Sequence, residues 1–265
     1  MARFAAHGFL HAHIADELLA RLAEVKRRFT SALLLGAPDD RLATALRAQG
    51  LRVTAADAGF GFARAAGGVQ CDEDRLPFAD GSFDLVVSAG VLDSVNDLPG
   101  ALLLARRVLR PDGLLLAGFA GAGSLPRLRA AMLAADMLAD RAAARVHPLV
   151  DVRAAGDLLA RAGFALPVAD GERLDVRYRS LAALLADLRF GAQGGVLADP
   201  PSSLGPIQAA AAHAAFAAAA DPDGRTTETF ELVYLIGWAP DASQPKPARR
   251  GSAVASLADA LKPKS

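Results

Sequence analysis

The sequence predicts an open α/β domain in which helices cover a mostly parallel sheet. Between residues 31 and 120, short apolar runs alternate with helix-like stretches of about ten residues, which is typical of βαβ units. The run "FDLVVSA" at 83–89 follows the turn "FADGS" and predicts a fully buried strand. Pro111, Asp112 and Gly113 then end a predicted helix and lead into another apolar run, "LLLAGFA".

The other elements follow from the same periodicities. Ile14, Leu18 and Leu22 recur at helical spacing and predict an amphipathic leading helix over 13–29. Gly171 is expected to turn the chain out of a strand. Strands are expected at 31–36, 51–57, 67–71, 83–89, 114–120, 165–170 and 229–239, and further helices at 39–49, 97–109, 126–144, 151–162, 180–190 and 205–219.

These elements suggest one principal domain with short additions. We expect an N-terminal helical segment over 1–30, a main domain over 31–240, and a helical insertion at about 172–222, before the last strand. The tail at 241–265 is polar and contains proline, which predicts mobility, with a short helix at 253–261.

Composition narrows the function classes. The 265 residues are 52% hydrophobic, and their 29 basic and 29 acidic side chains give no net charge, which argues against a general nucleic-acid binder. The single cysteine, Cys71, excludes an intrachain disulfide and suits a reducing compartment. Neither a transmembrane segment nor a secretory signal is apparent, and arginine and alanine are abundant. We therefore expect a cytoplasmic bacterial protein.

A ligand site is expected where the first two strands end. In open parallel sheets, ligands bind beyond the carboxyl ends of the strands, where the strand order reverses. Gly36 ends the first strand and can take a positive φ. Asp57, 21 residues later, ends the second strand, where a carboxylate can accept hydrogen bonds from ribose hydroxyls. One glycine and one acid are equally compatible with an ordinary structural role.

A longer motif strengthens the interpretation. The segment 71–119, "CDEDRLPFADGSFDLVVSAGVLDSVNDLPGALLLARRVLRPDGLLLAGF", resembles class I S-adenosylmethionine-dependent methyltransferases. The stretches "DVRAAGDLLARAGFALPVAD", "DGRTTETFELVYLIGWAP" and "SQPKPARRGSA" are similar to the methyltransferase-like family of the mitochondrial respiratory complex I assembly factor, an arginine hydroxylase, and its alphaproteobacterial relatives. The malonyl-carrier-protein methyltransferases are a more distant match.

The resemblance implies a Rossmann-like, seven-stranded sheet with helices on both faces, and S-adenosylmethionine as cofactor. Asp72 matches the acid that bonds the adenine amine in the family. A protein side chain or a respiratory-complex subunit is the implied partner. The implied cofactor-binding residues are Gly36, Asp57, Asp72, Glu73 and Ser88, and the catalytic candidates are Asp93 and Asn96.

The first-strand loop departs from the family's pattern. Where the family reads roughly "ALDLGCGxG", this chain reads "ALLLGAPDD", so the motif's acid falls on Leu34 and two glycines fall on Pro38 and Asp40. Proline removes an N–H, and the aspartates add negative charge near the cofactor's carboxylate. Asp39 is expected to cap the next helix. We therefore expect weak or altered cofactor binding.

Two function hypotheses remain open: a methyltransferase-type enzyme, and a catalytically silent fold that binds a protein partner. In the relatives of the complex I assembly factor, the implied reaction is hydroxylation of an arginine.

For several other residues, an ordinary structural role is expected. His7, His11 and His13 are expected at the surface of a fraying terminus, and Ser88 is expected to pack at a strand end. Asp97 is expected to be a helix N-cap, and "DLRFGAQGG" at 187–195 is either a lid or an ordinary loop.

Overall fold

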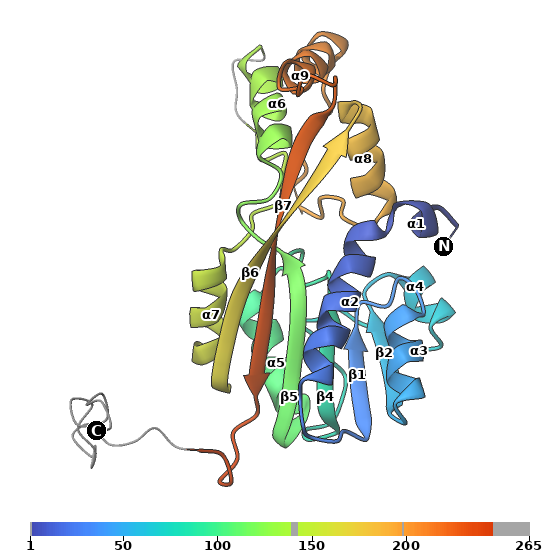
Figure 1. The fold of residues 1–265 in the computed structure, drawn as a ribbon, viewed down its shortest axis with the longest axis vertical. Helices are drawn as coiled ribbons and strands as arrows, with labels where there is room; N and C mark the ends of the chain where they lie inside the picture. Colours follow the sequence, from blue (N-terminus) through green and yellow to red (C-terminus); the bar gives the residue numbers. More distant parts are fainter. Residues whose placement is uncertain (1, 139–142, 198, 246–265) are drawn as a thin grey trace, which may run out of the picture.

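A computed structural model describes residues 2–138, 143–197 and 199–245. A seven-stranded sheet with the strand order β3-β2-β1-β4-β5-β7-β6 forms its centre (Figure 1). β7 is antiparallel to both of its neighbours, and the pairs among the first five strands are parallel. The strands are β1 (Ser31–Leu35), β2 (Arg52–Asp57), β3 (Val69–Gln70), β4 (Phe83–Ala89), β5 (Leu109–Ala120), β6 (Ala165–Tyr178) and β7 (Thr226–Trp238).

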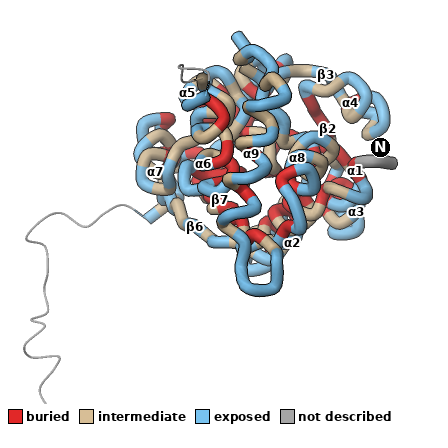
Figure 2. The backbone as a smooth tube through the Cα atoms, turned by 90° about the horizontal axis from the view of Figure 1, so that it is seen from above, coloured by how far each residue is buried: buried red, intermediate tan, exposed pale blue. Residues whose placement is uncertain are grey.

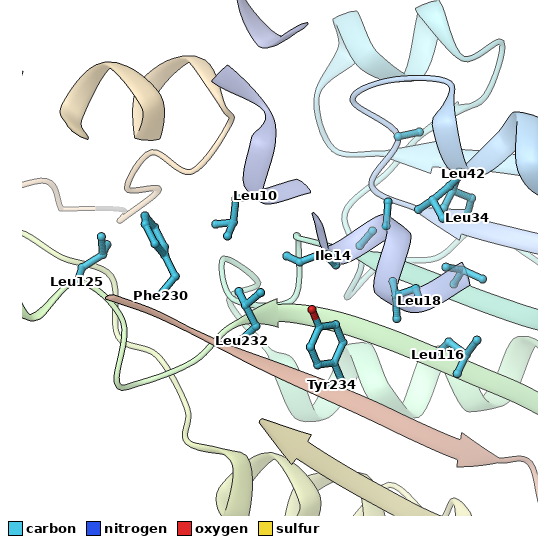
Figure 3. Packing of buried hydrophobic residues seen from close by; sticks show 14 of the residues in the cluster. Leu10, Ile14, Leu18, Leu34, Leu42, Leu116, Leu125, Phe230, Leu232 and Tyr234 are labelled. Atoms are coloured by element: carbon cyan, nitrogen blue, oxygen red, sulfur yellow. The ribbon is translucent and has the colours of Figure 1, made fainter. Parts of the chain in front are cut away.

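Helices pack on both faces of this sheet. Successive side chains of β1 point to opposite faces of the sheet. Leu34 lies in one core cluster with Leu18 of α2 (Phe9–Ala23) and Leu42 of α3 (Arg41–Ala48). Leu33 lies in the other cluster with Leu102 of α5 (Leu98–Val108). Figure 3 shows part of the first cluster, and Figure 2 shows the buried backbone at the centre of the molecule. The helices are α1 (Ala2–His7), α2 (Phe9–Ala23), α3 (Arg41–Ala48), α4 (Phe60–Ala65), α5 (Leu98–Val108), α6 (Pro126–Met137), α7 (Val152–Arg161), α8 (Leu181–Phe190) and α9 (Pro206–Ala218).

A small helical lobe stands on the carboxyl ends of β4 and β5. The long β6–β7 ribbon extends past the rest of the sheet, and α6, α8 and α9 gather around its far end (Figure 1). The carboxylate of Glu228, on β7, is fully buried and accepts hydrogen bonds from the backbone N–H groups of Arg127 and Leu128, at 3.0 and 2.8 Å. This acid therefore caps the first turn of α6 from a neighbouring strand.

The structure confirms the Rossmann-like class I methyltransferase architecture that the sequence predicts, and β4 begins and ends at the expected residues. Three expectations are wrong. The leading helix expected over 13–29 is α2, which begins at Phe9 and ends at Ala23. Gly171 does not end a strand, because it pairs with Val233 in the middle of β6, and the residues 172–178 are strand rather than insertion. The helix expected over 126–144 ends at Met137. The short helix expected at 253–261 lies outside the described residues.

Among the residues that the structure describes, no helix is both long and apolar enough to cross a bilayer.

Candidate functional site

The turn after β1 brings the chain close to β4. Gly36 has φ +78°, and a Cβ atom at this position would lie 2.6 Å from the carbonyl oxygen of Ala89 and 2.7 Å from Cγ1 of Val91. Only glycine fits such a contact with a left-handed backbone. β1 and β4 are neighbours in the sheet, whereas their chain connections lead to opposite sides of it. Gly36 therefore lies at the point where strand order reverses, as the sequence predicts.

Asp57 ends β2 beside this turn, and its carboxylate holds two loops. Oδ2 accepts a hydrogen bond from the backbone N–H of Ala37 at 2.9 Å, and Oδ1 accepts one from Gly59 at 2.7 Å. The residue is 7% exposed. Each carboxylate oxygen has a second lone pair, so Asp57 keeps capacity for ribose hydroxyls while it fixes the loop.

In the loop from Ala37 to Asp40, Asp39 does not have the capping role that the sequence predicts. The N-cap residue of α3 is Asp40, whose side chain makes no capping hydrogen bond. Asp39 accepts a hydrogen bond from the backbone N–H of Arg41 at 3.1 Å, two residues on, which forms a local turn. The prediction that Asp39 is the N-cap is therefore wrong by one residue, although its carboxylate does bond the start of α3.

Leu34 shows why the acid of the family motif is absent here. This side chain is fully buried in the core cluster that also contains Ile14 and Leu46. A carboxylate at this position would lie among aliphatic side chains, where an unpaired charge is costly. The sequence difference at position 34 is therefore part of how this chain packs α2 and α3 against the sheet.

An acidic cluster follows β3. Asp72 is exposed, whereas Glu73 is only 7% exposed. Burial, together with the charges of Asp57, Asp72 and Asp74, raises the pKa of the Glu73 carboxyl to about 7. Burial and the charges of Glu73, Asp72 and Asp57 raise the pKa of the Cys71 thiol to about 11, so this cysteine is not an activated nucleophile. The cluster therefore gathers several carboxyl groups at the end of β3, near Asp57.

The N-terminal histidines differ from each other, and the prediction of three surface histidines is wrong. His7 pairs with Asp187 at 2.6 Å, and His13 with Glu172 at 2.9 Å, so both tie the leading helices to distant parts of the chain. His11 is 4% exposed, and neither ring nitrogen has a hydrogen-bond partner. Ser88 at the end of β4 is also buried, and its Oγ also lacks a partner.

A cavity of about 350 Å³ opens between the sheet and the helical lobe. Asp93 and Ser94, which follow β4, line its floor, and apolar side chains from the lobe make most of its wall. Gln193 and Arg189 contribute polar groups, and Arg145, another lining residue, is held by Asp136 at 2.7 Å. The apolar lining residues are Ala120, Leu125, Leu128, Val146, Leu149, Leu185, Leu188, Ala192 and Phe230.

Among the described residues that line this cavity, Asp93 is the titratable group whose pKa is strongly shifted. Burial raises the pKa of its carboxyl to about 7, although backbone N–H groups, including that of Ala120, favour the charged form. Asn96 is exposed and does not line the cavity, so its predicted role rests on the sequence alone. Asp97 caps α5 as predicted, because its carboxylate accepts a hydrogen bond from Gly100 N at 2.9 Å.

Two of the four described non-glycine residues with positive φ lie at the cavity. Leu125 has φ +62° and Ala192 has φ +61°, a left-handed conformation that is costly for residues with a side chain. Both residues line the cavity. The glycine-rich segment 187–195, expected as either a lid or an ordinary loop, therefore forms part of the cavity wall. Leu125, Ala192, Glu228 and His11 carry no motif, so sequence reasoning missed them.

Comparisons with known proteins agree with this arrangement. A family model described as "Methyltransferase domain" matches residues 33–117. The YcgJ protein from Bacillus subtilis has a similar structure, with a TM-score of 0.60 over 86% of this chain and 99% of that chain, at 16% sequence identity. The matched family model and the shared fold identify a class I S-adenosylmethionine-dependent methyltransferase-like protein.

The chain is related to two groups of proteins. It is 35% identical to the mitochondrial arginine-hydroxylase NDUFAF5 of Danio rerio over 196 residues, which are 73% of this chain and 61% of that protein. It is 36% identical to the malonyl-[acyl-carrier protein] O-methyltransferase of Laribacter hongkongensis over 182 residues, 68% of this chain and 59% of that protein. The matched region thus spans less than two thirds of the length of these relatives.

Proposed function

We propose that this protein binds S-adenosylmethionine at the carboxyl ends of β1, β2 and β4 and acts as a methyltransferase-type enzyme on a substrate group held in the adjoining cavity. The observation that carries this proposal is Asp93, a carboxyl with a pKa of about 7 at the floor of a largely apolar cavity. Strongly shifted carboxyls in concave, apolar surroundings are frequent at active sites.

The residues that end β2 and β3 fit the adenosine half of the cofactor. Asp57 is fixed by two backbone N–H groups and retains lone pairs for the ribose hydroxyls. Asp72 is exposed next to it and is free to accept from the adenine amine. Glu73, with its pKa near 7, can offer either a donor or an acceptor there. The unpartnered Oγ of buried Ser88 adds a polar group at the end of β4.

The loop that would hold the amino-acid end of S-adenosylmethionine differs from the family's pattern, and we propose weak cofactor binding for this reason. Pro38 has no N–H to offer, and the N–H of Ala37 already donates to Asp57. Asp39 and Asp40 add negative charge beside the position of the ligand's carboxylate. At about 4–5 Å in a partly desolvated site, one like-charge contact costs on the order of 1 kcal/mol or more.

Asp93 can serve as the general base of a transfer reaction. The bound cofactor supplies a methyl group on a sulfonium leaving group. With that group in place, the Asp93 carboxylate would accept the proton that the substrate's nucleophile loses on methylation. A pKa near 7 suits this proton transfer at neutral pH. Positioning by the cavity walls supplies the remainder of the catalysis.

The relatives suggest where such an activity would operate. Their names describe an arginine hydroxylase of mitochondria and a methyltransferase that acts on a malonyl-[acyl-carrier protein]. We propose a protein-borne substrate, a role in respiratory complex I assembly, and a cytoplasmic location in a bacterium. Hydroxylation of an arginine side chain is the competing reaction that the first relative suggests.

A catalytically silent scaffold is the second candidate. The loop after β1 favours it, because Pro38 has no N–H to donate and Asp40 replaces a glycine of the family motif. Calorimetry with S-adenosylmethionine and S-adenosylhomocysteine separates the two candidates. We expect saturable binding that Asp72→Ala weakens, with Asp80→Ala as a control, since the Asp80 side chain is 79% exposed and lies outside the site. No binding to the wild-type chain would instead support the scaffold.

A further inference from the structure

His11 is a buried side chain whose two ring nitrogens make no well-formed hydrogen bond among the described residues, although the backbone of Gly36 lies near enough to favour the protonated ring. The imidazole is 4% exposed, and both ring nitrogens lack hydrogen bonds. Buried polar groups in proteins are nearly always hydrogen-bonded, so such an exception calls for an explanation. The ring lies edge-on to Phe4 of α1, with ring centroids 5.8 Å apart, so its position is fixed by packing.

The surroundings of His11 place it at the altered half of the cofactor site. A Cβ atom on Gly90, the residue that follows β4, would lie 3.5 Å from Cδ2 of His11 and 3.7 Å from Nε2 of Gln193. Gly36, Asp39 and Asp57 also lie close enough to influence the imidazole. His11 therefore borders the turn after β1 and the end of β4, while Gln193 continues from the same point into the 350 Å³ cavity.

Burial and the neighbouring charges act in opposite directions on the protonation of His11. Asp39 and Asp57 stabilise the protonated ring, whereas burial and Arg41 oppose protonation, and burial is the larger effect, so the pKa of His11 is lowered in the free protein. Arg41 is itself engaged with Asp16 of α2, at 2.9 Å. His7 and His13 have carboxylate partners already. His11 is thus a buried imidazole beside this turn, uncharged in the free protein at neutral pH, that can gain a proton when a carboxylate binds.

We propose that His11 binds the carboxylate of S-adenosylmethionine, in place of the backbone N–H groups lost with the loop glycines. This inference rests on the proposed function. A protonated imidazole donates a charge-assisted hydrogen bond and offsets the negative charge of Asp39 and Asp40. An α2 side chain, rather than the loop after β1, then holds the amino-acid end of the ligand.

The test compares two ligands and two variants of the full chain by calorimetry. S-adenosylhomocysteine carries the carboxylate, whereas 5′-methylthioadenosine lacks the whole amino-acid part. We expect His11→Gln to weaken binding of S-adenosylhomocysteine by about tenfold or more, the effect of one charge-assisted hydrogen bond, with little change for 5′-methylthioadenosine. The matched control is His13→Gln on the same helix, which should bind both ligands as the wild type does.

Proton uptake provides a readout on the unmodified protein. Pairing with a carboxylate raises the pKa of His11, so the wild type should take up protons when it binds S-adenosylhomocysteine at neutral pH. The uptake is measured as a dependence of the binding enthalpy on the buffer. Any contribution from Glu73, beside the adenosine, is common to both ligands and cancels in their difference. His11→Gln should remove that difference.

The outcomes separate this inference from the function on which it rests. If the wild type binds S-adenosylhomocysteine and His11→Gln binds it equally well, with no excess proton uptake in the wild type, the role of His11 is wrong while the proposed function stands. Equal losses for both ligands in His11→Gln would also overturn it, because they indicate a general structural effect. If the wild type binds neither ligand, the proposed function itself fails.

Discussion

Replacing Glu73 with glutamine should make the protein more stable at alkaline pH and leave its stability nearly unchanged at acidic pH. The pKa of this carboxyl is raised from 4.5 to about 7, with burial as the main cause. Between these values the folded chain holds a proton that the unfolded chain has lost, so this group makes stability fall as pH rises from about 4.5 to 7. Above pH 7 both states are charged, and the folded state carries the full cost of a buried charge.

The size of the effect follows from the pKa shift. One pKa unit corresponds to about 1.4 kcal/mol, so a change from 4.5 to about 7 sets an upper limit of about 3 kcal/mol. Glutamine is nearly isosteric and cannot ionise. Glu73→Gln should therefore raise the free energy of unfolding by about 1–3 kcal/mol at pH 8.5, and by close to zero at pH 4.5 or below.

The assay is urea unfolding of the wild type and the variant at several pH values, with the difference in unfolding free energy as the readout. Asp93 has a similar shift in the same direction, but it is present in both proteins and cancels. Asp80→Asn, at an exposed position, gives the control. A variant that is less stable than the wild type at pH 8.5, or a difference that does not change with pH, would refute the argument from burial.

Other perturbations test separate parts of the account. Glu228→Ala should lower the free energy of unfolding by about 2–4 kcal/mol, because two N–H groups of α6 lose a buried acceptor. Asp97→Ala, which removes an ordinary N-cap, should lower it by about 1 kcal/mol in the same urea assay. Gly36→Ala should destabilise more than Gly50→Ala, since both have positive φ but only Gly36 would place its Cβ against other atoms; equal losses would contradict the close approach to β4. Asp93→Asn should abolish transfer activity that rises with pH through about 7 while binding of S-adenosylhomocysteine persists, and an unchanged pH–rate profile would exclude Asp93 as the base.

The fold could be predicted from the sequence because its periodicities are clean. The fully buried β4 is an uninterrupted apolar run except for Asp84 and Ser88, and its turn signals are strong. α4 was missed because Phe60–Ala65 is short and contains a glycine, and its only buried residue is Ala63. The length of β6 was underestimated because Gly171 suggested a turn, whereas twelve paired positions with β7, from Ala165 to Tyr178, hold the strand together.

Only some of the candidate site residues could be predicted from the sequence. Gly36, Asp57 and Asp72 lie at strand ends, where family motifs and spacing identify them. His11 and Glu228 act across the fold, from an N-terminal helix and from the last strand, and no local pattern marks a residue whose importance comes from distant neighbours. The structure predicts that Leu34→Asp, which would restore the acid of the family motif, destabilises the core, because this side chain is fully buried among aliphatic residues.

The location of the cofactor site is tested most directly by backbone amide NMR shifts during titration of the full chain with S-adenosylhomocysteine. We expect saturable shifts at Gly36, Gly59, Asp72 and Gly90, which surround the ends of β1, β2, β3 and β4, and smaller shifts at the far end of the helical lobe. An absence of shifts at these four amides at ligand concentrations on the order of 1 mM, where even weak specific binding is detectable, would contradict the account.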